Sequence, residues 1–221
     1  MDAAEVPPAL LECLDAVARL EREAPPASRA ALAARLGLDE AAAARRLREL
    51  EARGLLRTER GGRLRLTAAA ERIALRLVRR HRLLERFLTD QLRLPWARVH
   101  EEACRLTPVL ADDVADALAR LLGDPATCPH GNPIPAADGT LTAEHGTPLD
   151  RLRAGQAGII LRIEREEPGL LRDLAALGLL PQTKVEIEEV APLGGPLLVR
   201  VGSARYALGR DVAARILVRE V

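Results

Sequence analysis

Aromatic side chains are almost absent from this sequence of 221 residues. Phe87, Trp96 and Tyr206 are the only aromatic residues, and Lys184 is the only lysine. Hydrophobic residues nevertheless make up 48% of the chain. The cores must therefore be built from Leu, Val, Ile and Ala, and the length suits two or three small domains.

Membrane spans, a secretory leader and a disulfide framework are also missing from the sequence. No apolar run reaches the roughly 18 residues that a membrane-spanning helix needs, and the N-terminus is acidic where a leader would be basic. Cys13, Cys104 and Cys128 are too widely separated to form a disulfide framework. We expect a cytoplasmic protein that has reduced thiols and no membrane partner.

Charge is balanced over the whole chain but not along it. The net charge is +1, which gives no sign of nucleic-acid binding by itself. The stretch 29–65, however, holds ten arginines against five acidic residues. Such a stretch is typical of one DNA-facing surface and equally of a solvated helix face with mixed charges.

The order of elements in this basic stretch favours the DNA-facing surface. Ser28 and Asp39 are N-cap residues for two short helices, "RAALAARLGL" and "EAAAARRLRELEARG", which are joined by a turn at Gly37. This is the helix-turn-helix pattern. Apolar and charged residues then alternate on both sides of Gly61 and Gly62, which predicts a β-hairpin. Two helices followed by an arginine-rich hairpin predict a winged helix.

The remainder of the chain predicts helices and then a small barrel. A long helix is expected from about residue 68 to 92, followed by helices that Pro108 breaks and Gly123 ends. An apolar stripe on these helices suits a partner helix and consists of Val109, Leu110, Val114, Leu118 and Leu121. Residues 128–148 lose this periodicity and indicate a linker. Five short strand-like runs beyond them, interrupted by one helical segment, indicate a small β-barrel.

Several stretches resemble the diphtheria toxin repressor family of iron- and manganese-dependent regulators, namely "RRHRLLERFLTDQLRL", "VHEEACR", "LADDVADAL" and "CPHGNPIP". The run "LLRDLAALGLLPQTKVEIEEVAPLGGPLLVRV" is similar to the SH3-like, iron-transport-accessory domain that longer members carry. The resemblance covers nearly the whole chain and implies a mainly α fold with a small β part. The implied domains are a winged helix-turn-helix at 1–75, a helical dimerisation and metal-binding domain at 76–131, a linker at 132–148 and an SH3-like β-barrel at 149–221.

The resemblance also implies metal ligands, because the family keeps a primary and an ancillary metal site. The residues that match the ancillary site are His81, Glu85 and His100. The SH3-like domain adds an acidic ligand, which we assign to Glu167, with Glu164 and Glu166 as close alternatives. Imidazole and carboxylate ligands suit Fe(II) or Mn(II) first, with Co(II), Ni(II) or Zn(II) as alternatives.

The primary site of the family is incomplete in this sequence. Glu12 and Cys104 match its first two requirements, but Thr107 and Pro108 stand where the family has a Glu-His pair. Neither side chain is a normal metal ligand, and Pro108 also lacks a backbone donor. A primary site of the family type therefore cannot form.

Three explanations for this change remain open. The ancillary site is the sole regulatory site, or a rearranged site uses the two matching residues with Cys13 or Glu101, or the chain has lost metal sensing. We favour the first explanation because its ligand set is complete. Cys128 and His130 lie close together in "CPHG", and we interpret them as a local turn with a buried thiol.

The second helix of the helix-turn-helix is expected to enter the major groove. Ala41 and Ala42 can contact thymine methyl groups, and Arg45 or Arg46 can pair bidentately with guanine. Phosphate contacts, which give affinity without sequence information, are expected from Arg29, Arg48, Arg60 and Arg63.

Together these features predict a metal-responsive transcriptional regulator, a repressor of metal-homeostasis genes. It should bind an inverted-repeat operator of double-stranded DNA as a homodimer. One alternative is a relative that binds DNA constitutively or answers another signal, and another is a metal-trafficking or adaptor protein. Because no phosphate loop, Ser-His-Asp order or pair of catalytic carboxylates stands out, we do not expect an enzyme.

Overall fold

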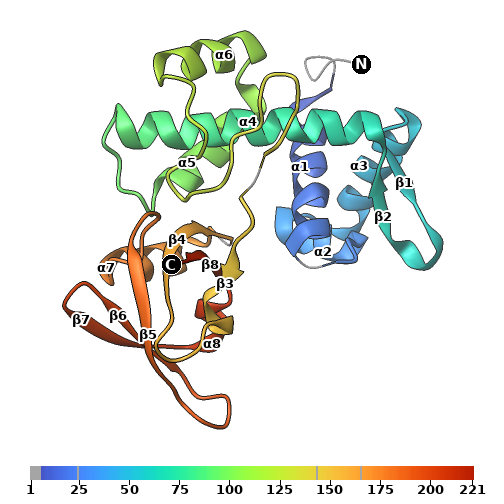
Figure 1. Ribbon diagram of the computed structural model, residues 1–221. Helices are drawn as coiled ribbons and strands as arrows, with labels where there is room; N and C mark the ends of the chain where they lie inside the picture. Colours follow the sequence, from blue (N-terminus) through green and yellow to red (C-terminus); the bar gives the residue numbers. More distant parts are fainter. Residues whose placement is uncertain (1–5, 24, 143, 165) are drawn as a thin grey trace. The chain divides into compact units, whose positions relative to one another are not determined.

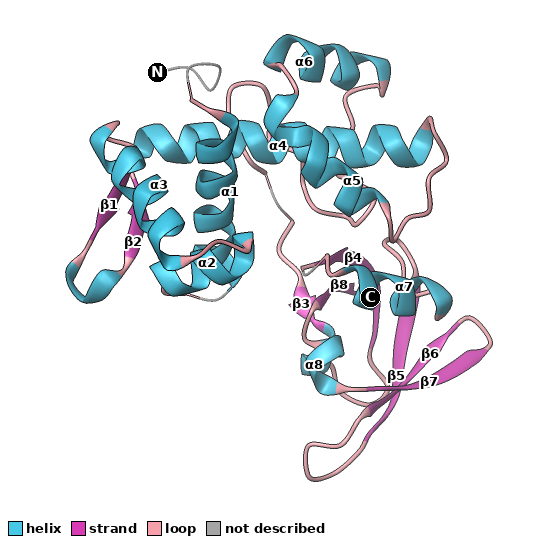
Figure 2. Ribbon diagram, turned by 180° about the vertical axis from the view of Figure 1, so that it is seen from behind, coloured by secondary structure: helices cyan, strands magenta, loops and turns pink. Residues whose placement is uncertain are grey.

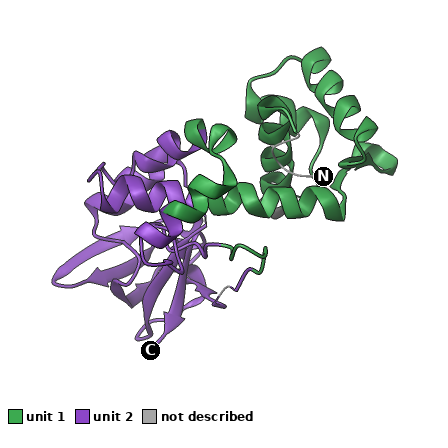
Figure 3. Cartoon of the chain, turned by 90° about the horizontal axis from the view of Figure 1, so that it is seen from above, with its two compact units in different colours: residues 1–81, 105–117, 135–140 green, residues 82–104, 118–134, 141–221 purple. Residues whose placement is uncertain are grey.

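The computed structural model describes residues 6–23, 25–142, 144–164 and 166–221. The chain forms two compact units, coloured separately in Figure 3. The first comprises residues 1–81, 105–117 and 135–140, and the second comprises 82–104, 118–134 and 141–221. Among the described residues, no helix is long and apolar enough to cross a membrane.

The first unit begins with three helices that meet the helix-turn-helix prediction (Figure 1). They are α1 (Pro8–Glu23), α2 (Arg29–Leu36) and α3 (Glu40–Ala52). The Ser28 hydroxyl accepts a hydrogen bond from the Ala31 amide at the start of α2, and the Asp39 carboxylate accepts one from the Ala42 amide at the start of α3. Both predicted N-caps are therefore confirmed, and they satisfy amides that the helices leave unpaired.

A two-stranded hairpin completes the winged helix. Strands β1 (Leu56–Thr58) and β2 (Leu64–Leu66) are antiparallel, with Leu56 opposite Leu66. The tip is a 3-10 turn, η2 (Arg60–Gly62), where Gly61 and Gly62 have φ values of 80° and 77° that other residues rarely adopt. The hairpin predicted around these two glycines is therefore confirmed.

The core of this winged helix is aliphatic and extends into the next helix. It joins apolar residues of α1, α2, α3 and the hairpin to Ala70, Ile73 and Leu77 of α4 (Ala68–Asp90). After α4 the chain forms α5 (Val99–Leu106), η3 (Thr107–Val109) and α6 (Asp112–Leu121). Pro108 lies in η3, so the predicted break between the helices is confirmed.

Arginines of α4 hold α6 in the first unit. The Arg80 side chain donates to Asp112 at 2.8 Å, and the Arg79 side chain donates to Asp116 at 3.1 Å. Arg79 also donates to the carbonyl oxygen of Pro135 at 2.9 Å. Because Arg80 is buried, its pairing with a carboxylate offsets the cost of removing the guanidinium from water.

The second unit contains a six-stranded antiparallel sheet that runs in the order β3-β8-β4-β5-β6-β7 (Figure 2). The elements are β3 (Thr147–Pro148), η4 (Leu149–Arg151), β4 (Ala157–Ile163), α7 (Pro168–Ala176), β5 (Lys184–Val190), β6 (Leu197–Val201), β7 (Ala204–Leu208), α8 (Arg210–Ala213) and β8 (Ile216–Glu220). The five expected strands and the helical interruption are confirmed, and β3 is additional. Trp96, from the segment before α5, packs against the core of this sheet.

The loop 128–132 lies against β4 within the second unit. The Ile163 amide donates to the His130 carbonyl at 3.0 Å, and the Asn132 side chain donates to the Ile163 carbonyl at 3.1 Å. Asn132 is buried. Residue 132, at which the linker is expected to begin, is therefore hydrogen-bonded to β4.

Gly131 permits this close approach. A Cβ atom at this position would lie 1.9 Å from the carbonyl oxygen of Leu161, and the residue has a φ of +84°. Gly139 has a similar φ of +86°, but a Cβ atom there would meet nothing within 4 Å. An alanine would therefore suffer backbone strain at both positions, but a steric clash only at position 131.

We predict that Gly131→Ala is much more destabilising than Gly139→Ala. The left-handed conformation alone costs an alanine about 1–2 kcal/mol, whereas forcing a methyl group into a packed contact adds roughly 1–3 kcal/mol. Thermal unfolding of the full chain in the presence of a chelator measures both. Equal losses in the two variants would show that the loop does not lie closely against β4.

Candidate metal centre

Two helices place the predicted imidazole and carboxylate ligands. His81 and Glu85 are one turn apart on α4 and therefore lie on the same face of that helix. His100 belongs to the first turn of α5, and its Nδ1 atom lies 3.0 Å from Oε1 of Glu85. Glu85 is fully buried, although it belongs to a helix whose other carboxylates are on the surface.

Of the acidic residues expected from the SH3-like domain, Glu166 and not Glu167 lies beside His100. Oε2 of Glu166 lies 2.8 Å from Nδ1 of His100. Glu167 is more than half exposed and pairs with Arg215 instead. The reason is the backbone: Glu167 is extended because Pro168 follows it, and successive side chains of an extended chain point to opposite sides.

A second imidazole and a thiol lie against the same two carboxylates. Nδ1 of His130 is 3.4 Å from Glu85 and 3.6 Å from Glu166. The Cys128 sulfur is 4.0 Å from the same nitrogen. Both residues are buried, as expected for a local turn with a buried thiol, but the sequence did not indicate that the turn would meet Glu85.

The donor atoms form overlapping groups that fit a divalent metal ion. Ligand atoms of His81, Glu85, His100 and Glu166 lie within 4.8 Å of one another. Imidazole nitrogens and carboxylate oxygens at this spacing are the donors that first-row transition ions take. The residues present therefore suit the metal that the resemblance implies.

Protons balance the charge of this cluster in the metal-free chain. Burial alone would lower the pKa of His100, but hydrogen bonds to Cys104, Glu166 and Glu85 outweigh burial and raise that pKa to about 12. Burial and the Glu85 carboxylate favour a higher pKa for Glu166, but the hydrogen bond and positive charge of His100 dominate and lower it. A divalent cation would take the place of the imidazole protons, so metal binding must release protons.

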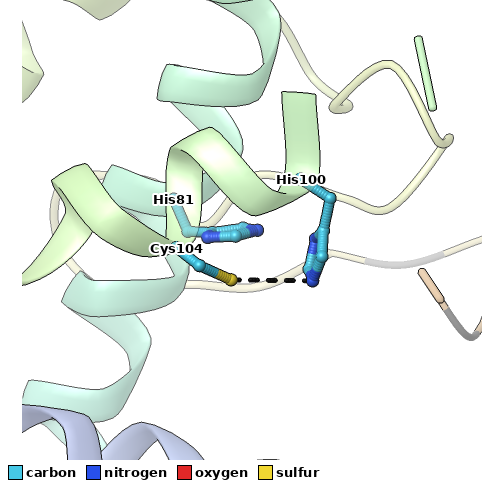
Figure 4. A group of neighbouring side chains, drawn as sticks. All are labelled: His81, His100 and Cys104. Carbon is cyan, nitrogen blue, oxygen red and sulfur yellow. Dashed lines mark hydrogen bonds between the residues drawn. The ribbon is translucent and has the colours of Figure 1, made fainter. Parts of the chain in front are cut away.

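His100 also contacts a thiol through its other nitrogen. The Cys104 sulfur lies 3.6 Å from Nε2 of His100, and Figure 4 shows it pointing at that ring. His81, His100 and Cys104 form a further group with ligand atoms within 4.8 Å of one another. Thr107, which stands in place of a family ligand, has its hydroxyl 3.3 Å from Nδ1 of His81. Threonine here is a hydrogen-bond partner of a candidate ligand.

Glu12 lies outside the candidate ligand groups. Among the residues that the structure describes, none of these groups contains Glu12. The Glu12 carboxylate instead lies 3.5 Å from the Arg46 guanidinium inside the winged helix. Cys13 is buried in the same core, and burial raises the pKa of its thiol. The structure therefore gives no support to a rearranged site built on Glu12 or Cys13.

The recognition helix α3 presents one exposed face. Ala41, Arg45 and Arg48 are spaced by one turn each and are exposed, whereas Ala43, Leu47 and Leu50 are buried in the first unit. Arg60 is exposed at the tip of the wing. Of the remaining expected contacts, Ala42 and Arg63 are half-buried, and Arg29 is exposed but pairs with Glu40 at 2.9 Å.

Arg46, which is expected to read bases, contacts α1 in the structure. Its guanidinium donates to the Ala9 carbonyl at 3.4 Å and lies 3.9 Å from the Cys13 sulfur. It is therefore directed at α1, because position 46 follows the exposed face by about 100° around the helix. Only Arg45 of the two candidates points to solvent.

Comparison with known protein families divides the chain into three matches. The winged helix-turn-helix DNA-binding family matches residues 13–57. The family described as iron dependent repressor, metal binding and dimerisation domain matches residues 67–136. The FeoA domain matches residues 147–220.

An iron-dependent repressor and a solved manganese-dependent repressor match over nearly the full length, and a diphtheria toxin repressor matches over about half. The iron-dependent repressor IdeR of Mycobacterium tuberculosis is 32% identical over 219 residues, which covers 91% of this chain and 93% of the relative. The diphtheria toxin repressor of Corynebacterium jeikeium is 40% identical over 125 residues, which covers 57% of this chain and 52% of the relative. A solved manganese-dependent transcriptional repressor in complex with manganese has a TM-score of 0.87 at 31% identity and covers 96% of this chain and 100% of its own.

These matches agree with the order of the domains and with the candidate metal centre. Matches to a winged helix, to a metal-binding and dimerisation domain and to a FeoA domain follow one another along the chain. The relatives are transcriptional repressors that depend on iron or manganese. The chain therefore belongs to the diphtheria toxin repressor family of metal-dependent, DNA-binding transcriptional repressors.

Proposed function

We propose that this chain represses metal-homeostasis genes as a homodimer on an inverted-repeat operator, and that one buried cluster is its regulatory metal site. We call His81, Glu85, His100 and Glu166 the regulatory cluster. The observation that carries the proposal is the spacing of its ligand atoms, all within 4.8 Å of one another. Fe(II) or Mn(II) is the expected ion, because the relatives depend on these metals and the donors suit them.

The loss of the family's Glu-His pair at positions 107 and 108 supports the regulatory cluster as the functional site. Thr107 and Pro108 supply no metal ligand, and Glu12 is engaged with Arg46. A bound ion would supply positive charge to the two buried carboxylates. Without it, the same carboxylates rely on protonated imidazoles, as the raised pKa of His100 indicates.

Helix α4 offers a direct connection between this cluster and DNA binding. Ile73 and Leu77 of α4 belong to the winged-helix core, and His81 and Glu85 follow on the next two turns. A shift of one end of a continuous helix is transmitted to the other end because helices are stiff. The ion then favours the arrangement of α4 to which it binds better, and thereby the DNA-binding state.

DNA binding with and without metal tests this function. Genomic fragments enriched by the full chain with Mn(II) or Fe(II) provide the operator, and fluorescence anisotropy measures their affinity with and without a chelator. We expect the chelator to weaken binding strongly. Unchanged affinity would favour constitutive binding, and failure to enrich any fragment would favour a trafficking or adaptor role.

We predict that Glu166→Ala lowers the metal affinity by at least roughly 100-fold. Loss of a residue that only supports a ligand already costs about 10- to 100-fold, and this substitution removes a ligand itself. Glu167→Ala is the matched control and should leave metal affinity unchanged. His81→Ala and His100→Ala should resemble Glu166→Ala, whereas Thr107→Ala removes a hydrogen bond to His81 and no ligand, and should therefore lower the affinity less than the loss of a ligand does. Calorimetric titration with Mn(II) measures all five, and equal effects of the two glutamate variants would contradict the assignment.

We predict that Arg45→Ala relaxes operator specificity, because one bidentate contact to guanine is worth about 1–3 kcal/mol of discrimination. Arg60→Ala should weaken binding to all sequences alike and reduce its salt dependence, as expected for a phosphate contact. Arg46→Ala should instead reduce the stability of the winged helix. Anisotropy with operator and scrambled DNA distinguishes these outcomes, and loss of specificity in Arg46→Ala alone would reverse our orientation of α3.

We predict that α6 forms the dimer interface, because Val114 and Leu121 lie two turns apart and remain 46% and 63% exposed. Glutamate at both positions should convert the protein to a monomer. Leu193→Glu is the control, since this leucine is fully exposed in the turn between β5 and β6. Sedimentation equilibrium measures the mass, and a dimer that survives the double substitution would place the interface elsewhere.

A further inference from the structure

We propose that Cys104 and Thr107 are positioning residues of the regulatory cluster and bind no ion themselves. Each of them holds one nitrogen of an imidazole, so that the other nitrogen of that ring is directed at the ion. Cys104 holds His100 in this way, and Thr107 holds His81. The inference rests on the proposed function, because a positioning residue requires a ligand to position.

The two nitrogens of His100 have different partners. Nδ1 lies 3.0 Å from Oε1 of Glu85 and 2.8 Å from Oε2 of Glu166, so an ion shared with these carboxylates must bind Nδ1. Nε2 lies 3.6 Å from the Cys104 sulfur, which belongs to the same face of α5 one turn later (Figure 4). Sulfur is a weak hydrogen-bond acceptor, and it receives the hydrogen that Nε2 must keep when Nδ1 binds the ion.

The Thr107 hydroxyl has the same relation to His81. Its oxygen lies 3.3 Å from Nδ1 of the imidazole. The two residues are 4% and 7% exposed, so this contact is made in a buried environment where polar groups require a partner. When the hydroxyl oxygen accepts the hydrogen of Nδ1, Nε2 keeps its lone pair for the ion. Metal-bound histidines almost always donate their other ring nitrogen in this way, which fixes the tautomer and the orientation of the ring.

The replacement at positions 107 and 108 suits such a support. Because proline has no amide hydrogen, Pro108 cannot continue the hydrogen bonding of α5, and the chain turns into η3 at Thr107. The threonine side chain is buried in this turn. A neutral hydroxyl holds an imidazole without the charge by which a carboxylate binds Mn(II) or Fe(II). Position 107 therefore orients a ligand and does not compete for the ion.

An alternative role for Cys104 is that of a ligand. Its sulfur lies within 4.8 Å of ligand atoms of His81 and His100. An ion on this side would take Nε2 of His100 and would leave the carboxylates with Nδ1. It would thus not compensate their buried charge, and a thiolate favours softer ions than Mn(II). Both arguments favour Cys104 as a hydrogen-bond acceptor.

Nitrogen-15 NMR of the full chain loaded with Zn(II), a diamagnetic ion, identifies the nitrogens that bind metal. The chemical shift of an imidazole nitrogen differs between its protonated and its metal-bound form. We expect zinc on Nδ1 of His100 and on Nε2 of His81, with a hydrogen on the other nitrogen of each ring. Coordination of His100 through Nε2, or of His81 through Nδ1, would overturn the proposal. Zinc on neither histidine would reject the regulatory cluster as well.

Calorimetric titration of conservative variants with Mn(II) tests the two hydrogen bonds. Thr107→Val keeps the shape of the side chain but lacks the hydroxyl, so the metal affinity should fall about 10- to 100-fold. Thr107→Ser keeps the hydroxyl and should bind like the unmodified chain. Cys104→Ala should lose affinity to the same extent as the valine variant, and Cys104→Ser, whose oxygen accepts the same hydrogen bond, should lose less. Thermal unfolding with a chelator shows whether each variant is folded.

These titrations separate the inference from the proposed function. Unchanged affinity in the folded Thr107→Val variant would overturn the role of Thr107. A loss in Cys104→Ala as large as that in Glu166→Ala would make Cys104 a ligand and overturn its positioning role. Either result leaves Mn(II) binding by the unmodified chain intact, and with it the proposed function. An unmodified chain that does not bind Mn(II) would reject both.

Discussion

Two buried carboxylates, Glu85 and Glu166, are the constraint on which the rest of the second unit depends. Negative charges placed this close together in the interior repel each other and lose their hydration, so each must be compensated at short range. His100 lies within hydrogen-bond distance of both carboxylates, and His130 approaches both from the other side. Protonated imidazoles supply this compensation in the metal-free chain, and at the proposed site a divalent cation would take the place of their protons.

The position of the SH3-like barrel against α5 and the loop 128–132 follows from this constraint. Glu166 can reach His100 only because β4 lies against that loop, which requires Gly131 and the two bonds to Ile163. Asn132 adds a further hydrogen bond to the Glu166 carboxylate. Each contact is local, yet together they place a side chain from the barrel beside one from α4.

Helix α4 connects the buried carboxylate Glu85 to the winged helix. Its first half is part of the winged-helix core, and its second half carries Glu85. The same helix presents Arg79 and Arg80, which hold α6. One helix therefore contributes to the core that positions the recognition helix, pairs with the helix that carries the exposed apolar stripe, and carries two of the proposed metal ligands.

Much of the fold could be predicted because local rules decided it. The N-caps at Ser28 and Asp39, the glycine pair of the wing and the alternating strands depend only on nearby residues. The pair His81 and Glu85 was recognisable for the same reason, since positions four apart share a helix face.

What the sequence could not predict depends on contacts between distant segments. Positions 166 and 167 are both glutamate, and only the extended backbone before Pro168 decides which side chain faces His100. The approach of His130 to Glu85 joins positions 45 residues apart through tertiary packing. Arg46 looked like a base-reading residue because its inward direction depends on where α1 packs.

The central claim is that the metal binds at the buried carboxylates and not at the altered primary site. Anomalous diffraction from crystals of the full chain grown with Mn(II), collected on both sides of the manganese absorption edge, locates the ion directly. The account predicts a peak bounded by His81, Glu85, His100 and Glu166. A peak on Glu12 and Cys104, with none at the buried carboxylates, would contradict it.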